Sequence, residues 1–249
     1  MMGLSIAGFD PSGGAGVLGD LKTFTSLGVY GTCVITALTA QNHTKVYGVE
    51  PVDLDFISEQ LDSLLRLYPI TYGKTGMLYS KEIIKLVSEK IIEYDLKLVV
   101  DPVMVASSGG NLFMDDSVIA MKKYLLDNCL LVTPNTYEAE VLSGISIHDE
   151  DSAIEAASKI GDECNVLITG GHQEGNSVFF DGEIKLFKEN LIKTDNTHGT
   201  GCALSAAIAA YLIKGKTLRE AIPNAMKHIH KSVEYGHYGT INQFYNIQK

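Results

Sequence analysis

Short runs of apolar and β-branched residues alternate along this chain with longer amphipathic stretches. This alternation is typical of the strand and helix units of a mostly parallel sheet. The apolar runs predict strands over Leu4–Ala7, Cys33–Leu38, Ile70–Thr75, Leu96–Val100, Leu130–Thr133 and Val166–Thr169. The amphipathic stretches predict helices over Val17–Leu27, Leu54–Leu67, Lys81–Tyr94, Asp116–Leu126, Thr136–Leu142, Ser152–Gly161, Cys202–Ile213 and Leu218–Tyr235. The Asp-Gly pair inside Phe179–Ile184 predicts a tight antiparallel hairpin at the sheet edge.

Length and composition favour a single α/β domain over residues 1–249, with a mostly parallel central sheet and helices on both faces. The chain has 249 residues, of which 45% are hydrophobic and 20% charged. Doubly wound domains often reach this size undivided. The sequence shows no internal repeat, linker or low-complexity tract that would divide it.

The net charge and the cysteine content limit the classes of binding partner and the cellular compartment that we expect. The formal net charge is -10 and no cluster of Lys and Arg interrupts it, so neither nucleic acid nor an anionic membrane is an expected partner. The start of the chain does not resemble a signal peptide, and no apolar run reaches membrane-spanning length. The four cysteines are widely spaced without a C-x-x-C pair, which argues against a zinc site and a disulfide framework. We therefore expect a cytoplasmic protein.

The segment Thr197–Cys202, directly before a run of small apolar residues, carries the strongest chemical signal. Gly199 and Gly201 leave backbone N–H groups uncovered where a helix begins, and the helix dipole adds partial positive charge there. Gly199, Thr200, Gly201 and Cys202 thus predict an anion hole. A cysteine at a helix N-terminus is expected to have a more acidic thiol, able to take a proton. A Gly-flanked turn also begins many helices that bind no ligand.

Two further loops follow predicted strands at the edge where open α/β sheets bind ligands. The glycines of Gly8–Gly16 permit close backbone approach to a ligand, but their spacing matches neither the dinucleotide fingerprint nor the P-loop. A flexible connector is the alternative. Gln41 follows the second strand, where its amide could read the polar edge of a planar heterocycle. A solvated loop amide is the alternative there.

Oxygen ligands gather after the fourth and fifth predicted strands. If these strands are neighbours, Asp101, Asn135 and Glu138 meet at one sheet edge, which suits Mg²⁺ that retains waters and binds phosphates. Asn135 could instead cap a helix, with Glu138 as its capping-box partner. Both interpretations can hold together.

The sixth strand leads into another backbone-rich loop, Thr169-Gly170-Gly171-His172, able to cradle phosphate. His172 and His198 are candidate proton-transfer groups, although loop histidines are commonly only solvated. Three loops that suit phosphate, one metal site and an anion hole together predict phosphoryl transfer, in which the protein chiefly positions the groups and stabilises charge.

The motifs along nearly the whole chain resemble the ribokinase-like small-molecule kinases, and within them the hydroxymethylpyrimidine and phosphomethylpyrimidine kinases of thiamine biosynthesis. The matching segments are Ile6–Gly16, Asp20–Phe24, Val34–Asn42, Lys74–Leu78, Asp101–Met104, Thr133–Asn135 with Glu138, and Thr197–Cys202. The resemblance implies a ribokinase-like fold and an enzyme that uses ATP and Mg²⁺. It would phosphorylate 4-amino-5-hydroxymethyl-2-methylpyrimidine and then the monophosphate, as a stand-alone kinase and a homodimer.

The resemblance also implies roles for individual residues. Cys202 stands where sugar kinases of the wider family carry an aspartate base, beside the anion hole of Gly199, Thr200 and Gly201. The implied pyrimidine pocket is lined by Gly8, Asp20, Gln41 and Met77. Asp101 and Glu138 would hold the metal, and Asn135, Thr169, Gly170 and Gly171 would face ATP.

One departure from the family pattern concerns Thr169. Many members read Lys-Gly-Gly where this chain has Thr169-Gly170-Gly171, and a threonine there resembles the related pyridoxal kinases. The alternatives are therefore a pyridoxal or pyridoxine kinase of the same fold, and a non-catalytic sensor of a pyrimidine or nucleotide.

Overall fold

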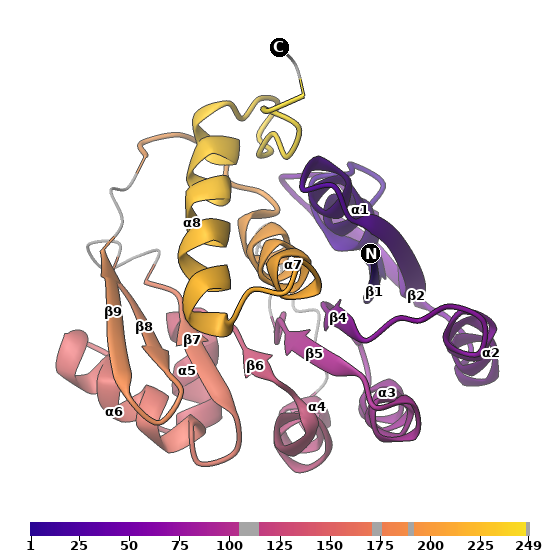
Figure 1. Cartoon of the computed structure of the whole chain (residues 1–249), viewed down its shortest axis with the longest axis horizontal. Coiled ribbons are helices and arrows are strands. Elements are labelled where there is room, and N and C mark those ends of the chain that lie inside the picture. The colour runs from indigo at the N-terminus through magenta and orange to yellow at the C-terminus, as the bar shows by residue number, and fades with distance from the viewer. Residues whose placement is uncertain (105–114, 171–175, 189–191, 248–249) are drawn as a thin grey trace.

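The computed structural model describes residues 1–104, 115–170, 176–188 and 192–247 (Figure 1). Its strands are β1 (Met2–Phe9), β2 (Tyr30–Gln41), β3 (Val46–Pro51), β4 (Tyr72–Thr75), β5 (Lys97–Val100), β6 (Leu131–Val132), β7 (Asn165–Ile168), β8 (Asn176–Phe180) and β9 (Ile184–Lys188). Its helices are α1 (Gly16–Ser26), α2 (Leu54–Leu65), α3 (Lys81–Tyr94), α4 (Asp115–Ala120), α5 (Thr136–Ser143), α6 (Glu150–Ile160), α7 (Thr200–Ile213) and α8 (Leu218–Glu234). A π-helical turn η1 (Met121–Leu125) and a 3-10 turn η2 (Leu126–Asn128) continue α4.

All of these strands form one nine-stranded sheet in the order β3-β2-β1-β4-β5-β6-β7-β8-β9. The strands from β2 to β7 in this order pair in parallel, whereas β3, β8 and β9 pair antiparallel with their neighbours. The mostly parallel sheet and the hairpin at Phe179–Ile184 are therefore confirmed. Strands β5 and β6 are neighbours, as the grouping of Asp101, Asn135 and Glu138 required.

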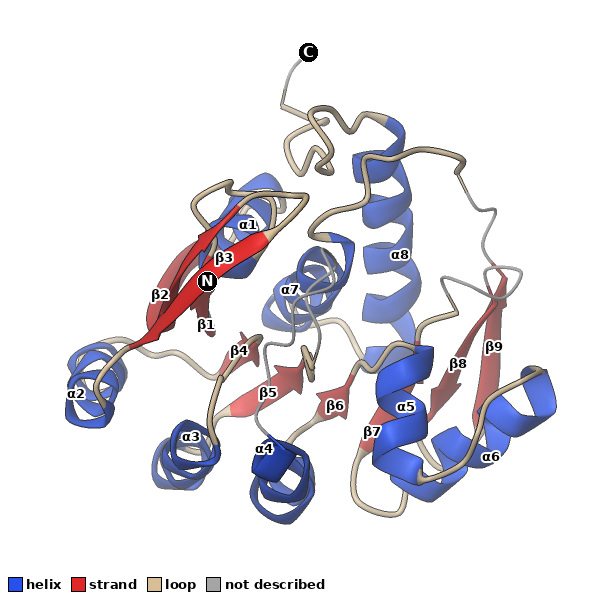
Figure 2. Cartoon of the chain, turned by 180° about the vertical axis from the view of Figure 1, so that it is seen from behind, coloured by secondary structure: helices blue, strands red, loops and turns tan. Residues whose placement is uncertain are grey.

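Helices cover both faces of the sheet (Figures 1 and 2). On β5, Leu98 and Val100 pack into the core formed with α2, α3, α4, α5 and α6. Val99, between them, packs into the opposite core, formed with α1, α7 and α8. This period of two is what a strand buried on both faces requires.

Helix α7 is buried on nearly every side, because its side chains are small and apolar all round. The residues from Ala203 to Ala210 are all buried, and so is Leu212. A helix without a polar face must lie inside the molecule, and α7 lies between the sheet and α8 (Figure 1). Its position is therefore fixed along its whole length, and its N-terminus is presented at the carboxyl edge of the strands.

The sequence did not predict strand β3. Val46–Pro51 is largely exposed and contains Gly48 and a terminal proline, so it lacks the apolar alternation that marks a half-buried strand. Strand β2 is also longer than predicted and includes Gln41, which therefore ends a strand rather than lying in the following loop. None of the helices within the described residues has both the length and the apolar character that a membrane span needs.

Candidate active site

The turn before α7 has the geometry that the sequence predicted for an anion hole. Gly199 is the residue before the helix, with a φ of 91° in the left-handed region. The Thr200 amide donates to the Thr197 carbonyl, 3.2 Å away, whereas the amides of Gly201 and Cys202 have no backbone acceptor in the described part of the chain. Gly201 is exposed and Cys202 only half-buried. Free donors at an accessible helix N-terminus suit an anionic group.

This turn lies against the loop that follows β1. A Cβ at Gly199 would come within 1.9 Å of the Gly14 carbonyl oxygen, so only glycine fits there, for reasons of space as well as of backbone angle. Gly16, at the start of α1, has a φ of 57°, and a Cβ there would come within 2.3 Å of the Gly8 carbonyl oxygen. The glycines of Gly8–Gly16 thus allow close contact between backbones, which is more than a flexible connector requires.

A buried cluster of charges lies beneath the turn. The Lys74 ammonium on β4 lies 3.1 Å from the Asp20 carboxylate and 3.9 Å from Asp101. Ser5 donates to the same Asp20 carboxylate at 2.5 Å. Burial would lower the pKa of Lys74, but the charges of Asp20 and Asp101 and the hydrogen bond to Asp20 raise it. Lys74 is therefore a buried cation held by two carboxylates.

Cys202 lies at the edge of this cluster. Its thiol lies beside Asp101 and opposes the rise in the pKa of that carboxyl. The Asp101 carboxylate also accepts from Ser205, on the next turn of α7, at 3.4 Å. Desolvation raises the pKa of the Cys202 thiol to about 12, because burial, together with the negative charges of Asp101 and Asp20, exceeds the opposing effect of Lys74. The prediction of a more acidic thiol is therefore wrong, because burial beside two carboxylates exceeds the effect of the helix N-terminus.

Asn135 and Glu138 form a capping box at the start of α5. Glu138 N donates to Asn135 Oδ1 at 2.9 Å, and Glu138 Oε2 accepts from Asn135 N at 2.9 Å. Glu138 Oε1 also accepts from Met104 N at 3.1 Å. Burial, and then the negative charge of Asp101, raise the pKa of Glu138 to about 7. The capping interpretation is confirmed, and the two carboxylates are close enough to repel each other.

The donor set fits Mg²⁺ held through water rather than in a closed cage. Both oxygens of Glu138 already accept backbone amides, and the described residues contain no group of three acidic or other metal-ligating side chains. Mg²⁺ commonly keeps several waters and uses one or two carboxylates together with substrate phosphates. Two buried, mutually repelling carboxylates at the phosphate end of the site match that mode.

Thr169 and Gly170 lie next to Asn135, as the predicted nucleotide site requires. Thr169 pairs with Asn135 as an isolated parallel bridge, and its amide donates to the Pro134 carbonyl at 2.9 Å. A Cβ at Gly170 would come within 1.6 Å of the Asn176 carbonyl oxygen, so the chain can turn here only with glycine. Gly171 and His172 lie outside the described residues.

The residues assigned to the ring pocket divide into two groups. A Cβ at Gly8 would come within 2.5 Å of Met77 Cε, and Met77 forms a small apolar cluster with Ala37, bordered by Val46 and Val103. Gln41, half-buried, pairs with Val46 where β2 meets β3. Asp20, by contrast, is fully buried in its pair with Lys74, so it has no exposed surface to offer a ligand.

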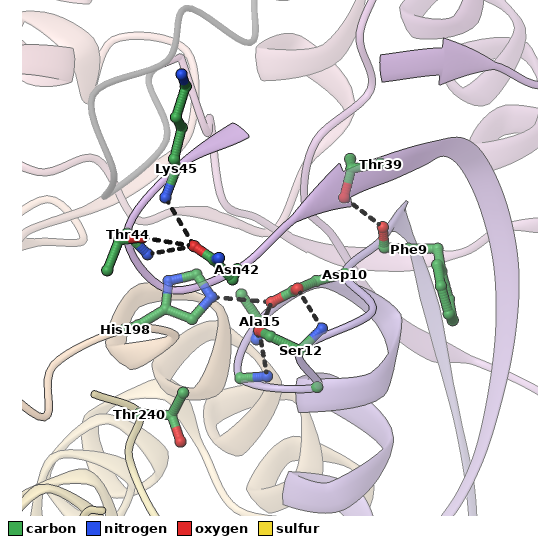
Figure 3. A network of polar contacts seen from close by, with 12 residues as sticks. Phe9, Asp10, Ser12, Ala15, Thr39, Asn42, Thr44, Lys45, His198 and Thr240 are labelled. Carbon is green, nitrogen blue, oxygen red and sulfur yellow. Dashed lines mark hydrogen bonds and ion pairs between the residues drawn. The ribbon is translucent and has the colours of Figure 1, made fainter. Parts of the chain in front are cut away.

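The sequence reasoning missed Lys74 and Asp10 as site residues. Lys74 interrupts an apolar strand, and a lysine in a buried strand is itself a signal of an ion pair. Asp10 follows β1 and hydrogen-bonds His198 at 2.8 Å (Figure 3). Because both side chains are buried, His198 is neither solvated nor free, which its position in a loop did not predict.

Comparison with known proteins identifies relatives along the whole chain. The family model described as phosphomethylpyrimidine kinase matches residues 10–245. The hydroxymethylpyrimidine/phosphomethylpyrimidine kinase of Rhizobium meliloti is 43% identical over 238 residues, covering 92% of this chain and 89% of that protein. The thiamine biosynthesis bifunctional protein ThiED of Geobacter sulfurreducens is 47% identical over 233 residues, covering 91% of this chain and 48% of that protein. The chain thus spans about half the length of the bifunctional relative.

Solved structures show the same fold. Phosphomethylpyrimidine kinase from Clostridium difficile has a TM-score of 0.84 and 36% identity, with 94% of this chain and 99% of that chain covered. The pyridoxal kinase from Staphylococcus aureus in complex with pyridoxal has a TM-score of 0.90 and 32% identity, with 99% of this chain and 94% of that chain covered. The Staphylococcus aureus enzyme has also been solved with AMP-PCP. From its family match and its relatives, this chain belongs to the phosphomethylpyrimidine kinase family.

Proposed function

We propose that this protein transfers the γ-phosphoryl group of ATP to the hydroxymethyl oxygen of 4-amino-5-hydroxymethyl-2-methylpyrimidine, and then phosphorylates the monophosphate, in thiamine biosynthesis. The observation that carries the proposal is the free N-terminus of α7, which meets Cys202, Asp101 and the loop after β1 at one edge of the sheet. The names of the relatives supply the substrate.

In this proposal the ring of the substrate lies over Gly8 and Met77, with Gln41 at its polar edge. The apolar cluster around Met77 offers a face for a flat ring, and Gly8 leaves room for the Met77 side chain to pack against the backbone of β1. The hydroxymethyl group then points toward Cys202. Holding two reactants in line contributes much of the rate in such a transfer.

The amides of Gly201 and Cys202 stabilise the negative charge that spreads over the transferring phosphoryl group. Because the Cys202 thiol is protonated at rest, its sulfur can accept the hydroxyl proton only while passing its own proton to Asp101, the carboxylate beside it. The substrate O–H bond breaks, the S–H proton moves to the carboxylate, and the number of protons is conserved. Cys202 remains the proposed proton acceptor in this form.

Asp101 and Glu138 would hold Mg²⁺ through water, and Asn135, Thr169, Gly170 and Gly171 would face ATP. When bound, the metal ion neutralises charge on the phosphates. The side chains themselves fix the loop after β5 to the start of α5 through the two hydrogen bonds of Glu138. This bond pattern orients the phosphate end of the site whether or not a nucleotide is present.

A pyridoxal kinase activity is the second candidate. It is favoured by the similarity to the Staphylococcus aureus enzyme and by Thr169, which stands where lysine is expected for the second phosphorylation. Mass spectrometry of the products formed with ATP and Mg²⁺ from the aminopyrimidine alcohol and from pyridoxal decides between them. A diphosphate product supports the proposal in full, a monophosphate limits it to the first step, and phosphorylated pyridoxal alone overturns it.

The remaining expectations concern partners and location. We propose that the enzyme acts on small molecules as a homodimer in the cytoplasm, without nucleic acid as a partner. The excess of acidic residues supports the last point, and the family resemblance supports the dimer. Sedimentation equilibrium and cell fractionation test the oligomeric state and the location.

A further inference from the structure

Asp10 connects segments that lie far apart in the sequence (Figure 3). Its Oδ1 accepts from Ser12 N at 2.9 Å, and its Oδ2 accepts from Ser12 Oγ at 2.9 Å and Ala15 N at 3.0 Å. His198 Nε2, from the turn before α7, approaches the same Oδ2 to 2.8 Å. Burial would raise the pKa of Asp10, but these hydrogen bonds together hold it below its ordinary value. The carboxylate is therefore ionised, and its hydrogen bonds go to residues of its own loop and to His198.

His198 is held on its backbone as well as on its ring. Its amide donates to the Gly239 carbonyl at 3.2 Å, and its carbonyl accepts from Ile241 N at 3.3 Å. Nε2 is the donor, because the ionised carboxylate can only accept, and Nδ1 is buried without a hydrogen-bond partner among the described residues. The ring therefore makes a single polar contact in this region, and that contact is to Asp10.

The next residue after His198 is Gly199, where the anion hole begins. A Cβ at Gly14 would meet His198 Cδ2 at 2.5 Å, and a Cβ at Gly199 would meet the Gly14 carbonyl oxygen at 1.9 Å. Gln243 Nε2 donates to that same carbonyl at 3.1 Å. The two loops are thus in contact over several atoms, and the Asp10–His198 hydrogen bond joins their side chains directly.

We propose that His198 is a positioning residue, whose hydrogen bond to Asp10 sets the distance between the substrate loop Gly8–Gly16 and the anion hole of α7. This inference rests on the proposed kinase function. The substrate loop belongs to β1 and α1, and the phosphate-binding amides belong to α7, so the in-line geometry depends on what holds these elements together. A misplacement of about 1 Å can cost on the order of a hundredfold in rate.

The test separates positioning from stability by comparing kcat with KM. In His198→Leu, we expect kcat to fall about tenfold or more, whereas KM for the aminopyrimidine alcohol and for ATP changes less than about threefold. His198→Gln places an amide donor near the position of Nε2 and should recover most of kcat. Rates are measured below the melting temperature of each variant, with folding checked by circular dichroism.

His228→Leu is the matched control, because it removes another buried histidine. His228 lies on α8, where its ring approaches Ser26 Oγ at 3.4 Å and packs on Tyr245 rather than on Asp10. This change should lower the melting temperature without lowering kcat. A double variant with Asp10→Asn and His198→Leu should lose no more kcat than the worse single variant, because one hydrogen bond is removed in both. Losses that multiply would overturn the proposal.

Hydrogen–deuterium exchange gives a readout that does not depend on activity. Peptides from residues 8–16 and 196–204 should both exchange faster in His198→Leu, and at least as fast in Asp10→Asn, which also weakens the bonds of Asp10 to Ser12 and Ala15. Helix α8 should be unchanged. An unchanged kcat with unchanged exchange in a folded His198→Leu overturns the positioning role. If the wild-type protein phosphorylates neither ring alcohol, the kinase function fails instead, and exchange still reports on the hydrogen bond.

Discussion

Lys74 shows how one buried side chain determines the charge balance of the site. Its ammonium has no exposed surface and is held between Asp20 and Asp101. Removing one partner of a buried ion pair leaves the other partner charged and unpaired. The resulting loss of folding free energy is larger than the net stabilisation that the intact pair provides. Stability should therefore depend on the pair and not on either residue alone.

We expect Lys74→Met to destabilise the protein by about 3–5 kcal/mol, because Asp20 then loses its cation. The double variant with Asp20→Asn should recover part of this loss. Lys85→Met is the control: the Lys85–Glu89 pair is exposed, with the two atoms 3.7 Å apart, and its loss should cost less than about 1 kcal/mol. Urea unfolding measures the stability of all three variants. Equal losses for Lys74→Met and Lys85→Met would contradict the claim that the Lys74 ion pair matters more because it is buried.

Cys202 should affect turnover far more than binding. In Cys202→Ala, we expect kcat to fall about a hundredfold, the lower range for loss of a proton-transfer group, with little change in the dissociation constant of the ring alcohol. Cys202→Ser should be slowed as well, but it keeps a hydroxyl for the proton relay to Asp101. Cys164→Ala serves as the control, because Cys164 directly precedes β7 and therefore lies at the amino end of that strand, opposite the site. Undiminished turnover in Cys202→Ala would show that the amides of α7 suffice.

Glu138 makes stability depend on pH. Its pKa is about 7 in the folded protein against an ordinary value of 4.5, so folding favours the protonated carboxyl. The stabilising contribution of the proton is complete below pH 4.5 and is lost as pH rises through 7. Relative to Glu138→Gln, the wild type should lose up to about 3 kcal/mol of stability across this window. Urea unfolding of both proteins at several pH values measures this loss. If the difference in stability between the wild type and Glu138→Gln does not change with pH, the pKa of Glu138 is not raised.

At the residue scale, the sequence predicted side chains that follow strands better than side chains inside them. Asp101 and Glu138 lie close together, as predicted, because parallel strands end at one edge of the sheet. The pKa of Cys202 was predicted in the wrong direction, because the sequence shows the helix N-terminus but not the depth of the thiol or the carboxylates around it. The direction of this pKa shift depends on how deeply the thiol is buried and on how close residues far apart in the sequence come to it.

At the scale of elements, the turn before α7 depends on glycine at position 199. We expect Gly199→Ala to reduce both stability and kcat strongly, because the left-handed φ and the approach to Gly14 both exclude a side chain. Gly28→Ala is the matched control: the φ of Gly28, 73°, is also left-handed, but no atom of the described residues lies within 4 Å of a Cβ placed there. Strain alone should cost about 1–2 kcal/mol there, with kcat unchanged. Thermal unfolding and initial rates of both variants check this.

Elements with a strong apolar pattern were predicted to within a few residues, and those without one were not. Helix α7 begins at Thr200, two residues before the predicted start, and ends at Ile213 as predicted. Strand β3 was missed because it is exposed on both faces and owes its conformation to pairing with β2. The predicted helix Asp116–Leu126 starts at Asp115 but passes into a π turn and a 3-10 turn, a change that no local pattern signals.

At the scale of the whole molecule, alternation predicted a parallel sheet but not its order. The order places β1 between β2 and β4, which brings Asp10 to His198 across 188 positions of sequence. Such contacts depend on the topology, which chain composition and periodicity leave open. The sequence therefore predicts which loops form the site, but not how far apart their side chains lie.

The complete site also predicts how the whole molecule responds to its ligands. A compound that binds only the folded protein stabilises it by mass action, by about 2.7 kcal/mol at one hundred times its dissociation constant. For a domain of this size that corresponds to a rise in melting temperature of about 5–10 °C. We expect the aminopyrimidine alcohol to give the larger rise and pyridoxal the smaller one, when both are compared at equal concentration in a thermal-shift measurement. The reverse order would assign the pocket over Gly8 and Met77 to the pyridine ring. Because stabilisation reports binding without turnover, the same ranking should persist in Cys202→Ala, and loss of the ranking in that variant would place Cys202 in substrate binding rather than in proton transfer.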